Sequence, residues 1–244
     1  MRRPMKEYRA YIFDLYGTLV DIHTDEEDPE LWSAFSCVMN EYGVQYKPQE
    51  LKKAYAGECL CETALMNRII QDRGIIGPPE INILHVWQSI AQGSGVTLTE
   101  SQLNHISEKF RQLSTRKIRL YDGAEDLLIL LKKLEKQVIL LTNAQASFTR
   151  PELEKLGIAQ SFDRIIISSE CGFKKPSPEI YSHLWCDGLT PETSVMIGND
   201  DVCDCWGAAN VGMDSIYIPT QQSPELNGPL PENCRRISSL SEIF

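Results

Sequence analysis

The sequence predicts an α/β fold in which a parallel sheet carries helices on both faces. Two observations predict it. From about residue 118 onward, short apolar runs alternate with amphipathic stretches, a pattern typical of β-α-β units in a parallel sheet. Residues 22–117 instead show only the periodicity of helices. We therefore expect a Rossmann-like core of residues 1–21 and 118–244, with residues 22–117 inserted as an all-helical cap domain.

The core elements follow from short segments of the chain. The first strand is predicted in "AYIFDL", at residues 10–15, and ends in a Gly-Thr turn. Four later strands are expected in "QVILLTN", "RIIISS", "SVMIGND" and "SIYIPT". Helices are expected over residues 123–136 and in "RPELEKLG", "SPEIYSHLWCDG" and "WGAANVG", the third with Ser177 as its N-cap. The proline-rich stretch from Gln221 to Pro231 is expected to be a loop.

The inserted segment carries its own helix signals. One apolar stripe closes at Gly43, and its members are Leu31, Phe35, Val38, Met39 and Tyr42. A second helix is expected in "KPQELKKAYAGECLCETAL", a third over residues 79–92, and a fourth after the capping box "TESQ" at residues 99–102. Because the insertion follows the first strand directly, we expect it to cover the adjoining edge of the sheet as a lid.

Composition excludes several classes of partner. The net charge of −10 argues against nucleic acid and against anionic membranes, which both require clustered Lys and Arg. No apolar run approaches the roughly 18 residues that span a membrane. The opening residues lack the apolar segment of roughly 7–15 residues that a secretory signal needs, so a cytoplasmic location is expected. The eight cysteines are then expected to be reduced thiols.

Polar residues follow the predicted strands at the points where these strands end. Asp14 ends the first strand, Thr142 and Asn143 follow the second, and "NDD" at residues 199–201 follows a later one. Ligands of open parallel sheets bind beyond the carboxyl ends of the strands. A carboxylate at such a tip can attack an electrophile, so Asp14 is a candidate nucleophile. Gly17 permits a tight turn, and the hydroxyl of Thr18 either orients Asp14 or caps that turn.

Thr142 and Asn143 suggest a site for an oxyanion. A hydroxyl group and the backbone N–H of Asn143, placed together at a strand end, can hold a phosphate or a similar anion. A polar turn at the end of a strand is the structural alternative.

Four segments resemble the motifs of the haloacid dehalogenase (HAD) superfamily. "FDLYGTLVD", "LLTN", "KKPSPEIY" and "IGNDDVCDCWGA" occur in the order of those motifs, and a helical cap follows the first. The resemblance covers nearly the whole chain and implies a hydrolase. It implies that Asp14 is the nucleophile, and that Lys175 neutralises the repulsion between Asp14 and the transferring group. Lys175 would thus act in catalysis and, with Thr142 and Asn143, in substrate binding.

The resemblance also implies a Mg²⁺ site. The family pattern takes ligands from Asp14, from the backbone carbonyl of Tyr16, and from Asn199 or a neighbouring acid. Asp200 and Asp204 are the neighbouring candidates, and Asp201 is expected to be a bystander. Asn199 is a neutral and weaker ligand than the Asp that relatives mostly carry. The favourable dipole at a helix N-terminus explains part of this acidic cluster.

Tyr16 leaves the reaction open. Phosphatases of the superfamily usually carry an Asp there, which protonates the leaving oxygen, and a phenol with a pKa of about 10 is a poor substitute. We favour a phosphatase that forms an aspartyl-phosphate on a small phosphorylated metabolite whose leaving group needs little protonation. Other hydrolysis on the same scaffold also remains open.

A metal-free 2-haloacid dehalogenase is the main alternative, because "DxYGT" and a tyrosine six residues after the motif lysine, Tyr181 here, are its forms. Residues 22–50, however, lack the arginine that such enzymes use, and Asn199 replaces their serine. A third hypothesis is that the chain is a binding or regulatory protein. Arg68, Arg73 and Arg111 are candidates to contact an anionic substrate, and the oligomeric state stays open.

Overall fold

Six parallel strands form the central sheet; the parallel sheet and five of its strands were predicted, whereas β8 was not. The structure is a computed structural model, and it describes residues 6–244. The strand order is β5-β4-β1-β6-β7-β8, and every neighbouring pair is parallel. The strands are β1 (Ala10–Phe13), β4 (Gln137–Thr142), β5 (Arg164–Ile167), β6 (Ser194–Gly198), β7 (Asp214–Tyr217) and β8 (Cys234–Arg236). The carboxyl ends of β4, β1 and β6 therefore lie side by side at one edge.

Alternating side chains of the sheet fill two cores. Tyr11 and Phe13 of β1 pack on one face, whereas Ala10 and Ile12 pack on the other. The first face is covered by α5, α6 and the C-terminal turn η4, and the second by the short helices α7, α8 and α9. These elements are α5 (Ala124–Lys133), α6 (Ala146–Lys155), α7 (Ser168–Cys171), α8 (Pro178–Ser182), α9 (Gly207–Asn210) and η4 (Leu240–Ile243). The predicted α/β layering is confirmed.

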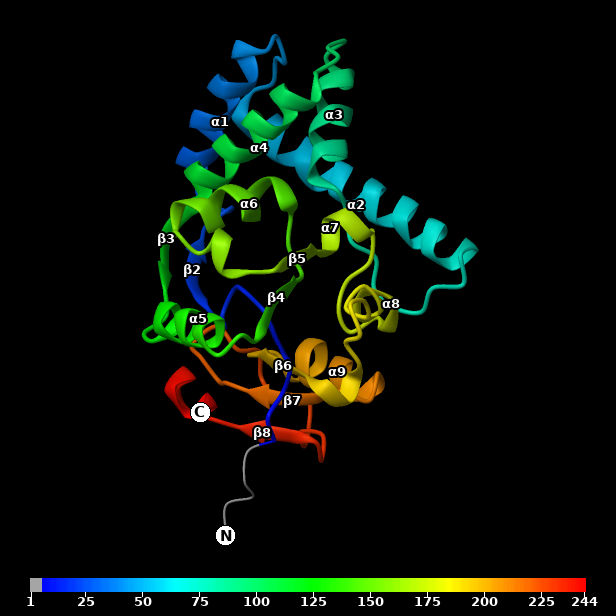
Figure 1. Ribbon diagram of the computed structural model, residues 1–244. Coiled ribbons are helices and arrows are strands. Elements are labelled where there is room, and N and C mark those ends of the chain that lie inside the picture. The colour runs from blue at the N-terminus through cyan, green and yellow to red at the C-terminus, as the bar shows by residue number, and fades with distance from the viewer. Residues whose placement is uncertain (1–5) are drawn as a thin grey trace.

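Four helices form a separate bundle at the end of the molecule opposite β8 (Figure 1). They are α1 (Pro29–Glu41), α2 (Pro48–Asp72), α3 (Ile83–Gly93) and α4 (Glu100–Ser114). The capping box at Thr99 is present, and Gly43 follows α1 with a φ of +80°. The bundle has its own apolar core, in which Trp32, Phe35 and Phe110 make edge-to-face and tilted ring contacts. Aromatic packing thus holds the insertion together independently of the sheet.

The ends of the inserted segment are not helical, which corrects the sequence prediction. Residues 20–24 form β2 (Val20–Thr24), which pairs antiparallel with β3 (Thr115–Leu120). This two-stranded ribbon connects the bundle to the core (Figure 1). The predicted boundaries at residues 22 and 117 therefore fall inside strands. Apolar and polar residues alternate in both strands, but over only about four residues each, which is a weak strand signal beside the longer helical pattern.

Two helices of the core also differ from the prediction. The helix expected from Ser177 to about residue 188 ends at Ser182, and the Ser177 hydroxyl bonds to Glu179 instead of capping the backbone. The helix expected at "WGAANVG" is preceded by a π-helical turn, η3 (Asp201–Trp206), capped by Asp200. The turns η1 (Ala159–Ser161) and η2 (Pro191–Thr193) complete the described elements. Short irregular turns leave little periodicity to read in the sequence.

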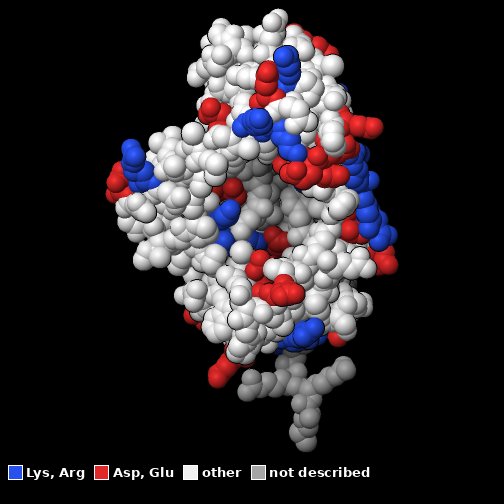
Figure 2. Space-filling model, turned by 180° about the vertical axis from the view of Figure 1, so that it is seen from behind, with Lys and Arg blue, Asp and Glu red and all other residues white. Residues whose placement is uncertain are grey.

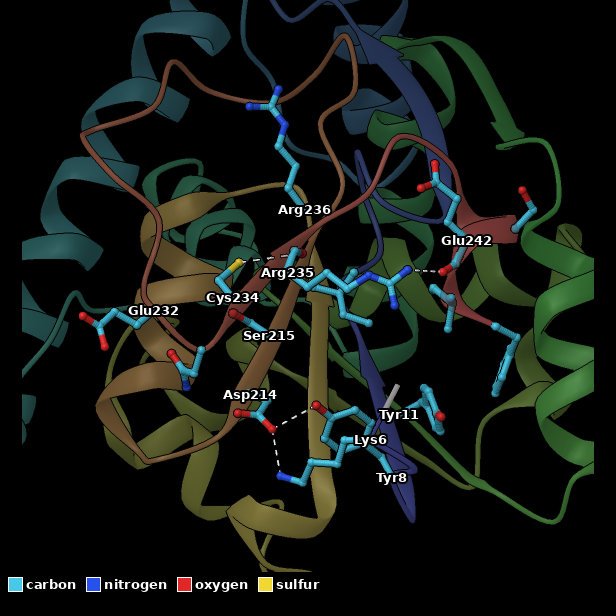
Figure 3. Close-up of a pocket in the computed structure, with 15 residues that line it drawn as sticks. Lys6, Tyr8, Tyr11, Asp214, Ser215, Glu232, Cys234, Arg235, Arg236 and Glu242 are labelled. Carbon is cyan, nitrogen blue, oxygen red and sulfur yellow. Dashed lines mark hydrogen bonds and ion pairs between the residues drawn. The ribbon is translucent and has the colours of Figure 1, made fainter. Parts of the chain in front are cut away.

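The surface is hollowed between the bundle and the core, and acidic and basic side chains lie in the hollow (Figure 2). A separate cavity of about 950 Å³ lies along β7, β8 and the C-terminal turn (Figure 3). There Lys6 and Tyr8 bond to Asp214 at 2.8 and 2.9 Å, and no predicted site residue lines this cavity. Across residues 6–244, no helix is both long and apolar enough to cross a membrane. All eight cysteines are unpaired, as expected.

Candidate active site

A buried ion cluster joins the ends of three neighbouring segments of the core. Lys175 Nζ lies 2.8 Å from Asp14 Oδ1 and 2.7 Å from Asp204 Oδ1. Asp14 follows β1, Lys175 precedes α8, and Asp204 lies in η3 after β6. All three side chains are nearly excluded from solvent, with Lys175 only 2% exposed. The structure thus brings together the first, third and fourth motifs.

The cluster has an excess of negative charge. Burial alone would lower the pKa of the Lys175 ammonium, but Asp14 and Asp204 outweigh it and raise that pKa. Burial raises the pKa of the Asp204 carboxyl, and Lys175 only partly opposes this. One ammonium cannot neutralise two buried carboxylates, so a further cation or a proton stabilises the cluster. A bound cation would reduce the repulsion between these carboxylates.

Gly198 and Gly17 allow the close packing of the fourth motif. A Cβ atom on Gly198 would lie 2.0 Å from Asp204 Oδ2. A Cβ atom on Gly17, whose φ is +87°, would lie 2.4 Å from the Asn199 amide. Both positions therefore require glycine so that the polar side chains can approach the end of β1.

Asn143 fixes the loop that carries Lys175. Its Oδ1 accepts from the Lys175 N–H at 2.9 Å, and its Nδ2 donates to the Lys175 carbonyl at 3.1 Å. The side chain of Asn143 therefore clamps the backbone of the third motif to the end of β4. The predicted role of its own N–H in anion binding stays a prediction.

Thr142 presents an unused hydroxyl at the same edge. The residue is 1% exposed, and its Oγ1 has no hydrogen-bond partner among the described residues. Buried hydroxyl groups are rarely left unpaired, because the lost hydration costs about 1–3 kcal/mol. An orphan donor at the end of β4 is the feature expected of a group that bonds to a substrate.

Thr18 and Asn199 lie around Asp14. The Thr18 hydroxyl is 3.2 Å from Asp14 Oδ2 and 3.2 Å from Asn199 Oδ1. One hydroxyl group thus contacts a carboxylate oxygen and an amide oxygen, so both side chains lie around the loop that follows β1. Hard oxygen donors of this kind suit Mg²⁺.

The other acids of the fourth motif have protein partners. Asp200 Oδ1 accepts from the N–H groups of Val202 and Cys203 at 2.9 and 2.7 Å, and so caps η3. Asp204 Oδ2 accepts from the Asp200 N–H at 3.0 Å. Asp201 Oδ2 accepts from the Asn227 N–H at 2.9 Å, whereas its buried Oδ1 has no hydrogen-bond partner among the described residues, and its expected bystander role stays a prediction. Within residues 6–244, no three His, Cys, Asp or Glu side chains converge on a metal position. A metal site here would need the Asn199 amide and a backbone oxygen.

The side chain of Tyr16 is hydrogen-bonded to α6. Its hydroxyl donates to Glu152 Oε2 and lies 3.1 Å from Thr149 Oγ1, both in α6. Arg111 Nε donates to Glu152 Oε1 at 2.7 Å, and its guanidinium lies 5.3 Å from the Tyr16 ring. Glu152 was not predicted as a site residue, because "RPELEKLG" indicates only a short helix. Its contacts depend on how α4 docks on α6.

The side chain of Tyr181 packs against η3. Its hydroxyl donates to the Cys203 carbonyl at 2.6 Å, and the ring lies against Gly207. The tyrosine that suggested a dehalogenase is fully buried and serves the packing of the fourth motif.

The fold and this cluster define a hydrolase of the HAD type. A family model described as haloacid dehalogenase-like hydrolase matches residues 8–212. The chain therefore belongs to the haloacid dehalogenase-like hydrolases.

Two relatives and two solved structures give the range of similarity. A glyceraldehyde 3-phosphate phosphatase of Methanothermobacter thermautotrophicus is 29% identical over 236 residues, 96% of each chain. A phosphoserine phosphatase of Thermus thermophilus is 30% identical over 130 residues, an alignment that spans 53% of this chain and 51% of the relative.

Among solved structures, a HAD phosphatase from Thermococcus onnurineus superposes with a TM-score of 0.59 at 18% identity and covers 96% of this chain and 95% of its own. A dehalogenase solved as an intermediate complex gives 0.57 at 19% identity, covering 98% and 97%. At these identities the two structures confirm the fold alone.

Proposed function

We propose that the protein is a Mg²⁺-dependent phosphatase that acts on a small phosphorylated metabolite through an aspartyl-phosphate at Asp14. The observation that carries this proposal is the buried Asp14–Lys175–Asp204 cluster beside the unpartnered hydroxyl of Thr142. A relative that aligns along nearly its whole length is named a phosphatase, which supports the same class.

The proposed reaction has two steps. A carboxylate oxygen of Asp14 attacks phosphorus, the bond to the leaving oxygen breaks, and an acyl phosphate forms on Asp14. Water then attacks the phosphorus, which releases phosphate and restores the carboxylate. Lys175 and Thr142, with the N–H of Asn143, hold the equatorial phosphoryl oxygens as their charge is redistributed.

Asp14, the carbonyl of Tyr16 and the amide of Asn199 are the proposed ligands of Mg²⁺. Asp200 and Asp204 remain further candidates: Asp200 Oδ1 caps η3, and the two Asp204 oxygens accept from Lys175 and from the Asp200 N–H. When bound, the ion would neutralise part of the phosphoryl charge. The Asn199 oxygen is neutral, so we expect weaker binding than an aspartate would give.

The substrate class follows from Tyr16. Its hydroxyl is bonded in α6, and burial, followed by the charge of Glu152, raises the pKa of this phenol. It is therefore a poor proton donor to a leaving oxygen at neutral pH. Acyl and aryl phosphates, whose leaving groups need little protonation, are the proposed substrates.

A 2-haloacid dehalogenase is the second candidate, because a halide leaves without a proton and Tyr16 provides none. The net negative cluster at Asp14 opposes it, since an anionic haloacid would be repelled there unless a cation is bound. We further propose that residues 22–117 act as the cap over this edge, and that the enzyme works in the cytoplasm as a protein that binds neither nucleic acid nor membrane.

One assay separates the two candidates. The purified enzyme is given acetyl phosphate, p-nitrophenyl phosphate or 2-chloropropionate, with Mg²⁺ or with a chelator. Phosphate release that depends on Mg²⁺ supports the proposal. Chloride release that is unaffected by the chelator, without phosphate release, would establish the dehalogenase instead.

A further inference from the structure

The contacts of Glu152 lie where the helical bundle meets the core. Arg111 is in the last turn of α4, just before β3, whereas Glu152 is in α6 and Tyr16 follows β1. Arg111 also lies 5.3 Å from the ring of Phe148 in α6, so its guanidinium is stacked between two aromatic rings. Three segments that are distant in the sequence are thus joined at one carboxylate.

Glu152 is buried and fully engaged. It is 8% exposed, receives Arg111 Nε at 2.7 Å on one oxygen, and receives the phenol of Tyr16 on the other. A buried ion pair adds little stability compared with a well-packed apolar pair, but removing one partner leaves an uncompensated charge. The arrangement therefore constrains geometry more than it adds stability.

The residue held by this contact is next to the nucleophile. Tyr16 is two positions after Asp14, and the turn that follows is closed by Gly17 N–H to the Val20 carbonyl at 2.8 Å. The side chain of Tyr16 packs against the same core as Leu15 and Leu19. Fixing the ring of Tyr16 therefore fixes the direction of its backbone carbonyl, which is one of the proposed ligands.

We propose that Glu152 is a positioning residue: through Tyr16 and Arg111 it sets the geometry of the loop after β1 while α4 is docked on α6. This positioning role deepens the proposed function. It rests on the proposed function only where it concerns the bound metal and the reaction. Glu152 contacts neither Asp14 nor Lys175, so its effect acts through Tyr16. Tyr16 thus has a positioning role in place of the acid role of its counterparts.

The test uses Glu152→Gln, with Glu154→Gln as the matched control, because Glu154 lies on the same helix and is exposed. Hydrogen exchange of the amides of residues 17–20 is measured first, since these amides are hydrogen-bonded within the turn. We expect their exchange to be about tenfold faster in Glu152→Gln, the equivalent of losing about 1.4 kcal/mol from local stability, and unchanged in Glu154→Gln.

Steady-state kinetics provide the second readout. We expect the Mg²⁺ concentration for half-maximal phosphatase activity to rise several-fold in Glu152→Gln, with KM for the phosphate ester little changed. Tyr16→Phe, which keeps the ring and the Arg111–Glu152 pair, should shift both readouts in the same direction and covers the case in which Glu152→Gln fails to fold.

The outcomes are distinguishable. A lower Tm with unchanged exchange at residues 17–20 and an unchanged Mg²⁺ requirement would reduce Glu152 to a structural role and overturn the inference. Faster exchange in a protein whose wild type hydrolyses no phosphate ester would support the positioning role while overturning the proposed function.

Discussion

At the scale of single residues, Asp14 is the group on which the proposed chemistry depends. Its oxygens bond to Lys175 at 2.8 Å and to Thr18 at 3.2 Å, contacts that an amide can largely keep. We expect Asp14→Asn to fold with a Tm near that of the wild type and to lose all measurable turnover, because the amide is no nucleophile. Thermal unfolding tests the expected Tm, and phosphate release tests the expected loss of turnover. Turnover at the wild-type rate would contradict the proposed mechanism.

A substitution at Thr142 is expected to affect stability and activity differently. Because its buried hydroxyl has no hydrogen-bond partner within residues 6–244, Thr142→Val should leave the free energy of unfolding unchanged or raise it by up to about 2 kcal/mol. If that hydroxyl binds the transferring group, kcat should fall on the order of 10²-fold, as for the loss of one oxyanion donor. Denaturant unfolding and steady-state kinetics measure both. A destabilised variant with normal kcat would show that the hydroxyl has a structural partner.

At the scale of elements, the end of β4 controls the third motif. Asn143→Ala removes both hydrogen bonds to the Lys175 backbone, so we expect a loss of about 2 kcal/mol in the free energy of unfolding. The activity should fall more than this loss alone explains, since Lys175 is no longer held against Asp14. Activity measured well below the Tm tests this point; a stable loop with unaltered kcat would contradict it.

The connection between α2 and α3 rests on the core through Glu80. Ser168 Oγ donates to Glu80 Oε2 at 2.6 Å, and burial raises the pKa of this carboxyl. In the folded state the group therefore holds its proton to a higher pH than in the unfolded state. Wild-type stability should fall relative to Glu80→Gln as pH rises from the unfolded pKa through the folded pKa.

Unfolding of both proteins across pH 4–8 measures this difference. The gap in Tm should move in favour of Glu80→Gln with rising pH and become constant above the folded pKa. A gap that is independent of pH would mean that Glu80 has the same pKa in both states.

The elements also show what the sequence could and could not reveal. Five strands of the sheet were predicted because each is an apolar run followed by a polar tip, as in "AYIFD", whereas β8, with the sequence "CRR", has no apolar run and was missed. The ribbon of β2 and β3 was missed because its alternating runs, Val20 to His23 and Lys117 to Leu120, have only about four residues each, the shortest length that indicates a strand. The candidate site could be read from the polar tips, whereas the Tyr16–Glu152–Arg111 contact depends on packing between distant helices.

At the scale of the whole molecule, the bundle and the core have separate apolar cores and meet along α4 and α6. The Asp14–Lys175–Asp204 cluster lies at the strand edge of the core and holds two carboxyl groups against one ammonium group. A divalent cation should therefore stabilise the folded protein by mass action, following the logarithm of its concentration. We expect millimolar Mg²⁺ to raise the Tm of the wild type and to leave that of Asp14→Ala nearly unchanged. Equal shifts in both proteins would place the bound ion elsewhere.

The central claim is that Asp14 becomes phosphorylated during turnover. The direct measurement is rapid acid quenching of the enzyme with acetyl phosphate and Mg²⁺, followed by mass spectrometry of the peptide that contains residues 10–20. The proposed mechanism predicts a phosphoryl group on Asp14 within the first turnover, absent in Asp14→Asn and in the presence of a chelator. Rapid phosphate release with no phosphorylated peptide at any quench time, or with the group on another residue, would contradict it.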